Sequence, residues 1–225
     1  MTPLRTAVAA LLLTCAPFAA ANAADAPDLS ISLAPIADET GALTRLDVAI
    51  RFEAPQPGDA LAAMAVTANS VETSARSLRT MVFSDARGIV PVASEDTALD
   101  GDNIERKWKP LLPVQGPVTV AYSIPIDPAQ PELAKPQYEL RAGEGGLSGA
   151  GNAFLVLPAD SVAREVTVHW DLSRAGSGAR AVSSLGAGDS RSSRPLTSDQ
   201  IGGTYYMAGR IGAYSKGPFF SAWQG

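Results

Sequence analysis

Apolar side chains alternate with polar or small ones along most of the chain, which is the period-two pattern of half-buried β-strands. Segments 29–36 and 43–52 both show this pattern and are joined by the turn-forming sequence ADETGA, so they predict a β-hairpin. The alternation is strongest in segment 118–126, where Val, Tyr and Ile side chains share one face. Pro125 in that segment predicts either a sheet edge or a point where pairing stops, because proline lacks the N–H group that a ladder needs.

Other segments carry the same signal with differing clarity. Segment 152–158 is continuously apolar, as a strand buried on both faces would be, whereas the Ala- and Met-rich segment 60–68 fits either a strand or a short helix. The sequence LTSDQIGG predicts one helical turn capped by Thr197 or Ser198. The Ser-, Gly- and Arg-rich stretch 173–193 predicts a long flexible loop. Further strands are predicted at 77–83, 89–94, 104–112, 166–172 and 204–214.

No periodic helix longer than about ten residues is present, so the sequence predicts an all-β fold, an antiparallel β-sandwich with long Gly/Ser-rich loops. We expect a single domain over residues 24–215, followed by an aromatic tail over residues 216–225.

The first residues have the parts of an export signal. Arg5 precedes an apolar run at 7–14, and small residues at 21–23 mark a cleavage site. We therefore expect residues 1–23 to be removed and the mature protein to be periplasmic or secreted. Cys15 is the only cysteine, so a chain starting at residue 24 has no disulfide, thiol nucleophile or thiolate metal ligand. Its 17 basic and 23 acidic residues give a net charge of −6, which disfavours nucleic acid and, after cleavage, anionic membrane as partners.

The only histidine, His169, lies in the strand pattern VTVHWDL, two residues before Asp171 and on the same face. A His–Asp pair can orient an imidazole for general-base catalysis. The alternative is a polar strand face exposed to water, which accounts for every residue of the segment. One histidine without a cysteine does not build the usual zinc site.

Three other motifs have simpler structural interpretations. The GDS sequence at 188–190 resembles a serine-esterase block, but it lies in the predicted flexible loop, with Arg191 where an apolar residue is expected. The glycine-rich stretch 143–152 lacks the spacing of a phosphate-binding loop. The acidic stretch 94–105 could bind calcium, yet Ile104 and Glu105 occupy positions that break the usual calcium-loop pattern, which favours a solvated turn. The sequence therefore predicts no catalytic, cofactor-binding or metal-binding residue, and no cofactor.

Aromatic residues are concentrated near the C-terminal end of the sequence, where they could bind a partner. The predicted interaction surface comprises Tyr205, Tyr206, Phe219, Phe220 and Trp223.

Six sequence blocks, taken in order, resemble the N-terminal β domain of exported glycyl-aminopeptidase-type metallopeptidases, which are PDZ-bearing relatives of the gluzincins. The blocks are DVAIRF, GPVTVAYSIPI, NAFLVLP, VTVHWDLS, AVSSLGAG and YYMAGRIGAY, and the resemblance covers roughly residues 29–215. It implies a β-sandwich that packs against a zinc-dependent catalytic domain and performs no chemistry itself. The zinc ligands and catalytic glutamate of that family belong to the domain that follows, and their motifs are absent here.

Three hypotheses follow from the sequence. The first is a non-catalytic domain that braces a peptidase catalytic domain or another exported protein, with the aromatic tail as a severed domain junction. The second is a free-standing periplasmic module that binds a protein or ligand through Tyr205, Tyr206 or the terminal aromatics. The third is an enzyme of unrecognised type built around His169 and Asp171.

Overall fold

The computed structural model describes residues 29–68, 70–126, 140–143, 145–216 and 219–224, with side chains as far as Gly212. The predicted export signal at 1–23 lies outside these residues. Strands are by far the commonest element of the described chain, which confirms the predicted all-β class, and they form three larger sheets and a separate hairpin. Within these ranges, no helix has the length and apolar character that crossing a membrane requires.

The first sheet has seven strands and is antiparallel except for one parallel pair, β1 with β13. Its long central strands come from the hairpin and the strongly alternating segment that the sequence predicts. In spatial order the strands are β16 (Ser190–Arg191), β13 (Val166–Trp170), β1 (Leu29–Ala37), β2 (Leu43–Phe52), β9 (Val118–Pro125), β5 (Arg79–Asp85) and β6 (Gly88–Val90).

Two smaller sheets complete the body. The second runs in the order β10 (Arg141–Gly143), β11 (Gly146–Ala150), β17 (Tyr205–Gly209), β14 (Arg180–Ser183) and β15 (Gly186–Ala187). The third runs β12 (Leu157–Pro158), β3 (Ala62–Ala68), β8 (Ile104–Pro110) and β7 (Val92–Ala98), with β4 (Val71–Glu72) also paired to β3. The separate hairpin joins β18 (Ile211–Lys216) to β19 (Phe219–Gln224). Two 3-10 turns, η1 (Ser74–Arg76) and η3 (Gly151–Ala153), and the short helix α1 (Ser198–Gly202) lie between strands.

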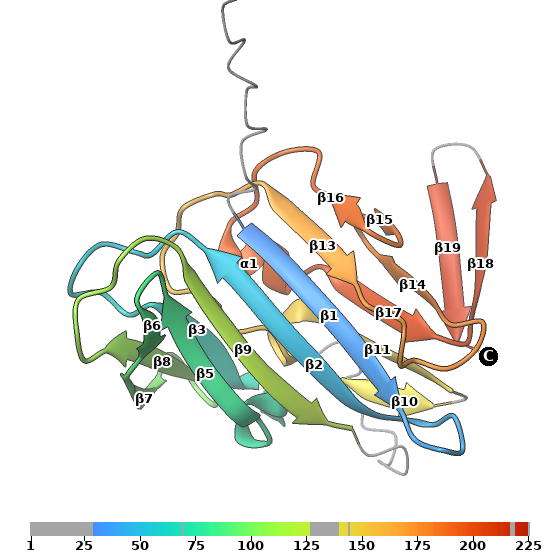
Figure 1. Ribbon diagram of the computed structural model, residues 1–225, viewed down its shortest axis with the longest axis horizontal. Coiled ribbons are helices and arrows are strands. Elements are labelled where there is room, and N and C mark those ends of the chain that lie inside the picture. The colour runs from blue at the N-terminus through green and yellow to red at the C-terminus, as the bar shows by residue number, and fades with distance from the viewer. Residues whose placement is uncertain (1–28, 69, 127–139, 144, 217–218, 225) are drawn as a thin grey trace, which may run out of the picture.

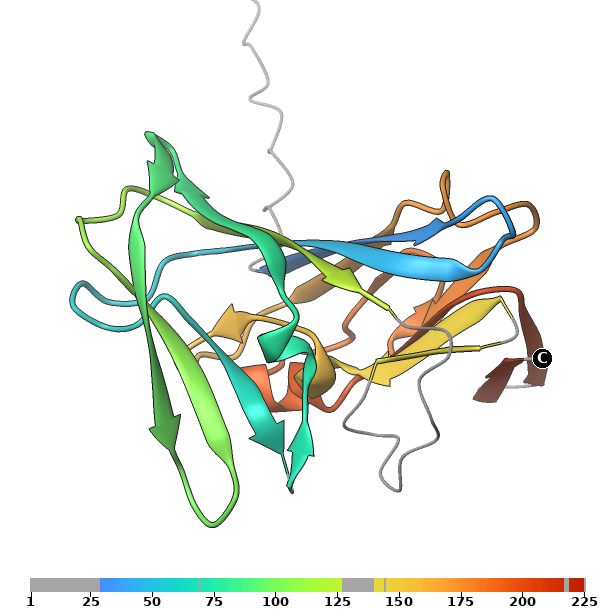
Figure 2. The same ribbon diagram turned by 90° about the horizontal axis from the view of Figure 1, so that it is seen from below.

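The sheets are arranged as a sandwich with an extension (Figures 1 and 2). The second sheet lies against the β13–β1–β2 part of the first sheet, while the third sheet projects from the end that carries β5 and β6. One continuous apolar core joins all three sheets. Near the third sheet, the rings of Phe83 on β5 and Trp108 on β8 are 6.2 Å apart, so this contact links the extension to the first sheet.

The alternation in the sequence correctly identifies the inner face of the first sheet. Alternate residues of β2 and β9 are 3 % exposed or less and form the floor of the core. These residues are Leu46, Val48, Ile50, Phe52, Val118, Val120, Tyr122 and Ile124. Pro125 is the last residue of β9 and pairs with Arg45, so it marks the end of pairing in a central strand rather than a sheet edge.

The prediction of a flexible loop over 173–193 is wrong. This stretch contains β14, β15 and β16, and β14 pairs along its whole length with β17. On its other side β17 packs closely against β11: Gly209 has φ +108°, and an added Cβ would lie 2.4 Å from the carbonyl oxygen of Gly145. The strand partners of the stretch lie elsewhere in the sequence, so local composition does not predict them.

The segment 152–158 is buried as predicted but is not a continuous strand. It begins with η3, and only Leu157–Pro158 pair with another strand, β3. The Tyr122 side chain completes the hydrogen bonding of this segment: its hydroxyl donates to the Phe154 carbonyl at 2.8 Å and accepts from the Val156 N–H at 2.9 Å. A tyrosine from the first sheet therefore replaces a neighbouring strand.

Several local predictions are decided by the structure. Segment 60–68 forms a strand, β3, rather than a helix. The helical turn is confirmed as α1, with Thr197 as its N-cap in a reciprocal capping box with Gln200. The predicted strand at 89–94 is divided between β6 of the first sheet and β7 of the third sheet. The predicted strand at 204–214 is divided between β17 of the second sheet and β18 of the separate hairpin. The predicted boundary between residues 215 and 216 falls inside β18, which pairs with β19 through Lys216.

Candidate functional site

A hollow of about 480 Å³ lies on the outer face of the first sheet. It crosses β13, β1, β2, β9 and β5, and its floor is made of small side chains, including Ser32, Ala49 and Ala121. Because strand side chains alternate between faces, these small residues are the outer counterparts of the large core residues on the same strands. The hollow therefore results from a run of small outward side chains across neighbouring strands.

One wall of this outer groove is a chain of polar contacts. The Ser123 hydroxyl donates to Asp47 at 2.6 Å, and the Thr80 hydroxyl donates to Ser123 at 3.4 Å. Arg45 completes the row, with its Nε 2.9 Å from an Asp47 carboxylate oxygen. Thr80 has φ +52° and lies where the β5–β9 register shifts, a bulge that redirects its side chain toward the groove. The polar groups are thus already bonded to one another.

The opposite wall contains His169, but its partner is not the predicted one. The His169 Nδ1 lies 2.6 Å from a carboxylate oxygen of Asp189, and the other oxygen of Asp189 accepts a hydrogen bond from the Trp170 N–H at 2.9 Å. The hydrogen bond from the Trp170 N–H, and to a smaller extent the contact with His169, hold the pKa of Asp189 below its usual value. Asp171 instead accepts from the Ser173 N–H at 3.0 Å in a turn that follows the end of β13.

The His169–Asp189 pair is an exposed surface contact rather than an enclosed site. The side chains of both residues are more than half exposed, so water screens their interaction. Ser190 of the GDS motif pairs with Val168, whose side chain is buried, and its hydroxyl lies 3.3 Å from that of Ser183. Ser190 is therefore on the opposite face of the sheet from His169. Among the described residues, no three His, Cys, Asp or Glu side chains gather in a way that could hold a metal ion.

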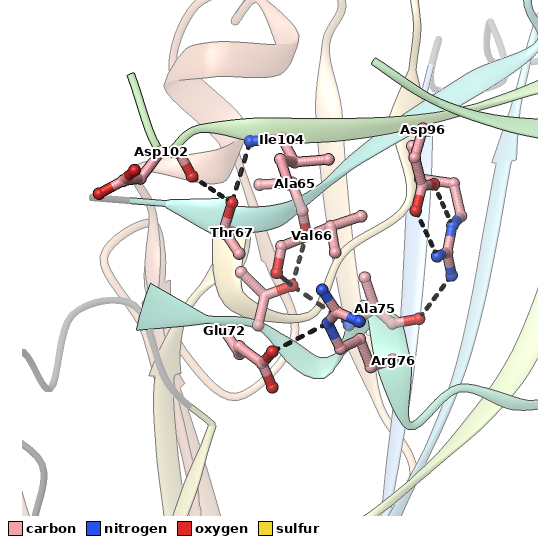
Figure 3. Close-up of polar contacts among 11 residues, drawn as sticks. Ala65, Val66, Thr67, Glu72, Ala75, Arg76, Asp96, Asp102 and Ile104 are labelled. Carbon is pink, nitrogen blue, oxygen red and sulfur yellow. Dashed lines mark hydrogen bonds and ion pairs between the residues drawn. The ribbon is translucent and has the colours of Figure 1, made fainter. Parts of the chain in front are cut away.

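The acidic stretch 94–105 forms a hairpin, β7 to β8, whose carboxylates are largely bonded within the chain; Figure 3 shows the bonds of Asp96. Arg106 donates to both oxygens of Asp96, at 2.6 and 2.8 Å, and to the Ala75 carbonyl at 3.0 Å. The hydrogen bond from Arg106 holds the pKa of Asp96 below its usual value. Asp102 accepts from the Ser70 hydroxyl at 2.7 Å. These bonds explain the conformation of the hairpin without a calcium ion.

The structure separates the residues of the predicted interaction surface. Tyr205 is 37 % exposed and could take part in a contact. Tyr206 is wholly buried, with its ring edge-on to Phe154 at 5.4 Å, so its inclusion in a surface was wrong. The two tyrosines are neighbours on β17, and strand alternation turns only one of them outward. Phe219, Phe220 and Trp223 belong to β19, whose side chains lie outside the described part of the structure.

A surface that sequence reasoning missed lies at the end of the first sheet beside β6. Ile89 is 80 % exposed, and Leu111 and Leu112 are 63 % and 60 % exposed. Leu112 and Pro113 line both of two adjoining hollows, of about 250 and 360 Å³, and Ile89 lines the first. We call the side chains of Ile89, Leu111 and Leu112 the apolar end patch. The sequence KPLLPV carries a signal for it, because prolines on both sides of two leucines end a strand and leave the leucines in a loop.

Comparison with solved structures places this fold. Over 86 % of its length the chain superposes on an aminopeptidase N family protein from Idiomarina loihiensis, with a TM-score of 0.58 and 10 % sequence identity. The chain has the fold of an aminopeptidase N-terminal region. It spans about a third (32 %) of the length of that aminopeptidase. The fold predicted from the six sequence blocks is thereby confirmed, and the narrower glycyl-aminopeptidase resemblance stays a prediction.

The likeness to leukotriene A4 hydrolase from Saccharomyces cerevisiae is weaker, with a TM-score of 0.47 and 9 % identity over 84 % of this chain and 30 % of the hydrolase. The likeness to an M1 zinc metallopeptidase mutant from Deinococcus radiodurans has a TM-score of 0.40 and 11 % identity over 87 % of this chain and 45 % of the metallopeptidase. No family model matches the sequence, and a search of curated proteins gives no match.

Proposed function

We propose that this chain is the non-catalytic N-terminal β-sandwich domain of an exported, aminopeptidase-like protein, and that it braces a peptidase catalytic domain. The observation that carries the proposal is the superposition on an aminopeptidase N family protein, which uses 86 % of this chain but only 32 % of the other. The chain corresponds to one part of a larger peptidase architecture. The apolar region at residues 7–14 supports export in the same proposal.

The apolar end patch supports a bracing role. Large apolar side chains that are more than half exposed and adjoin one another are uncommon on isolated soluble domains and are typical of protein–protein contacts. The prolines around the two hollows limit backbone motion there, so the surface is held ready for a partner. We propose that the catalytic domain covers Ile89, Leu111 and Leu112.

The first test measures the size of the native polypeptide. Peptides from this chain would be traced by mass spectrometry in size-separated protein from the source cells, in both whole-cell and exported fractions. The proposal expects them in an exported polypeptide much longer than 225 residues that also has aminopeptidase activity. An exported species no longer than this chain would overturn it and favour the free-standing binding module.

The second test concerns the contact itself. In the full-length polypeptide, Leu112→Asp should lower the temperature at which peptidase activity is lost, because a charge would be buried against the catalytic domain. The matched control is Val162→Asp, since Val162 is similarly exposed at 55 % and lines neither hollow of the patch. Equal effects of the two changes would show that the patch is not the contact.

A further inference from the structure

The edges of the three larger sheets are not alike. Six strands end the orders of the three sheets, and five of these six have only two or three residues: β6, β10, β12, β15 and β16. The sixth, β7, has seven residues (Val92–Ala98) and pairs with β8 in one unbroken register. Short edge strands are a common protection against unwanted pairing with other chains. The described residues therefore leave one of these edges open to another strand.

Two backbone hydrogen bonds at the ends of the β7–β8 pair define which backbone groups of β7 point outward. The Leu111 N–H donates to the Pro91 carbonyl and the Leu99 N–H to the Asn103 carbonyl, both at 2.9 Å. In an antiparallel pair, hydrogen-bonded residues alternate with residues that face away. Odd-numbered residues of β7 thus bond to β8. The N–H and C=O groups of Val92, Ser94, Asp96 and Ala98 point toward the open edge.

This open edge keeps one register with β8 and is held by side-chain hydrogen bonds. It contains no proline, lysine or bulge, and residues 93–98 are all exposed. Arg106 on β8 fixes the middle of the strand through its two bonds to Asp96, and its third bond, to Ala75, ties the hairpin to η1 (Figure 3). A partner strand would therefore bind without first ordering the edge, which favours affinity.

Charge decides which partner fits. A second copy using all four outward residues in antiparallel pairing would place Glu95 directly opposite Glu95 of the other copy, and like charges in that position repel. The stretch 92–105 contains five carboxylates and no Lys or Arg. Asp96 is matched by Arg106, and Lys107, which lies across from Glu95, is 3.2 Å from Glu105. Glu95 is therefore the charge that an added strand would meet.

We propose that β7 is a docking edge for an extended basic segment of another protein, which adds to the third sheet as an antiparallel strand. Main-chain hydrogen bonds to Ser94, Asp96 and their outward neighbours would supply the affinity. A lysine or arginine opposite Glu95 supplies the selectivity. Pairing at Ser94 and Asp96 uses none of the three side chains of the apolar end patch, so it does not depend on the bracing role.

The test uses this chain alone and two synthetic peptides of about nine residues, one alternating lysine with threonine and the other glutamate with threonine. Fluorescence anisotropy should show binding of the lysine peptide, with affinity that falls as salt rises, and much weaker binding of the glutamate peptide. Hydrogen exchange should slow at the N–H groups of Ser94, Asp96 and Ala98. The odd-numbered N–H groups of β7, already bonded to β8, should change little.

Matched variants locate the binding to the edge. Ser94→Pro removes one outward donor without touching the β7–β8 ladder and should weaken lysine-peptide binding roughly tenfold, whereas Ser94→Ala keeps the donor and should bind like the wild type. Glu95→Lys should reverse the preference between the peptides. Circular dichroism and urea unfolding would verify that each variant is folded. Unchanged binding by folded Ser94→Pro, or equal binding of both peptides, would overturn the proposal.

Discussion

Tyr122→Phe is the substitution that most directly tests how the sandwich is held together. Tyr122 is a first-sheet residue, 3 % exposed, whose hydroxyl bonds to two backbone groups of the buried segment after η3. Burial raises the pKa of its phenol, so the hydroxyl stays protonated and remains a donor throughout the working pH range. The change to phenylalanine removes one oxygen and leaves the ring in place.

The expected loss follows from the groups left behind. Without the hydroxyl, the Phe154 carbonyl and the Val156 N–H are buried with no partner in its place. An unsatisfied buried group costs about 1–3 kcal/mol, so two of them predict a loss of about 2–6 kcal/mol in the free energy of unfolding. The ring still fills its space, so no cavity adds to this figure.

Tyr206→Phe is the matched control. Tyr206 is also fully buried, and its hydroxyl lies near Thr204 but has no hydrogen-bond partner of acceptable geometry. Removing that oxygen leaves no backbone group unsatisfied, so the free energy of unfolding should change by less than about 1 kcal/mol. It could even increase, because the unpaired hydroxyl is no longer buried.

Both variants would be compared with the parent chain by urea unfolding followed through tryptophan fluorescence and circular dichroism. Equal slopes in denaturant would show that the difference in midpoint reflects stability alone. If Tyr122→Phe and Tyr206→Phe lower the free energy of unfolding by similar amounts, the two hydrogen bonds of the Tyr122 hydroxyl do not anchor the buried segment, and the reasoning is refuted.

Three further results are expected. Gly209→Ala should cost about 2 kcal/mol or more in urea unfolding, because its Cβ would lie 2.4 Å from the Gly145 carbonyl oxygen and its φ is +108°; an unchanged midpoint would contradict this close approach. The hydrogen bond from Arg164 is the main reason that the pKa of Asp160 lies below its usual value in the folded chain. Ionised Asp160 therefore stabilises the fold above the usual carboxyl pKa, and this stabilisation is lost as the pH falls through the lower pKa of the folded state. Asp160→Asn should therefore flatten the acid side of a stability–pH curve, and an acid limb of parental steepness would refute the assignment. His169→Ala should change stability by less than about 0.5 kcal/mol, since the side chain is 57 % exposed, and a larger loss would show that its ion pair is structural.

The sequence predicts the inner face of the first sheet well because burial there depends on local alternation. Leu46 and Val120 are inside for the same reason that their neighbours are outside, and no long-range information is needed. The helical turn was equally local, since the Thr197 cap and its Gln200 partner lie within one turn.

The errors arise where distant segments decide the structure. Nothing in the Ser- and Gly-rich composition of 173–193 indicates that β14 pairs with β17, and nothing near His169 in sequence indicates that Asp189 is its partner. The apolar run at 152–158 predicts a strand, because buried segments usually satisfy their backbone hydrogen bonds by pairing with another strand. Tyr122, more than thirty residues earlier, performs that role instead.

The outward positions of a strand are less predictable from the sequence than the inward ones. The outer groove and the β7 edge both lie at outward or edge positions. Ser32, Ala49 and Ala121 are ordinary small residues until neighbouring strands place them side by side as the floor of the outer groove. Likewise, the composition of 94–105 predicts a solvated acidic turn, and residues 94–98 are exposed but belong to strand β7. Whether β7 is central or at an edge depends on the order of the whole third sheet. The same carboxylate, Glu95, would be a poor choice inside a sheet and is a selective one at an open edge. Its function can therefore be inferred only once the topology is known.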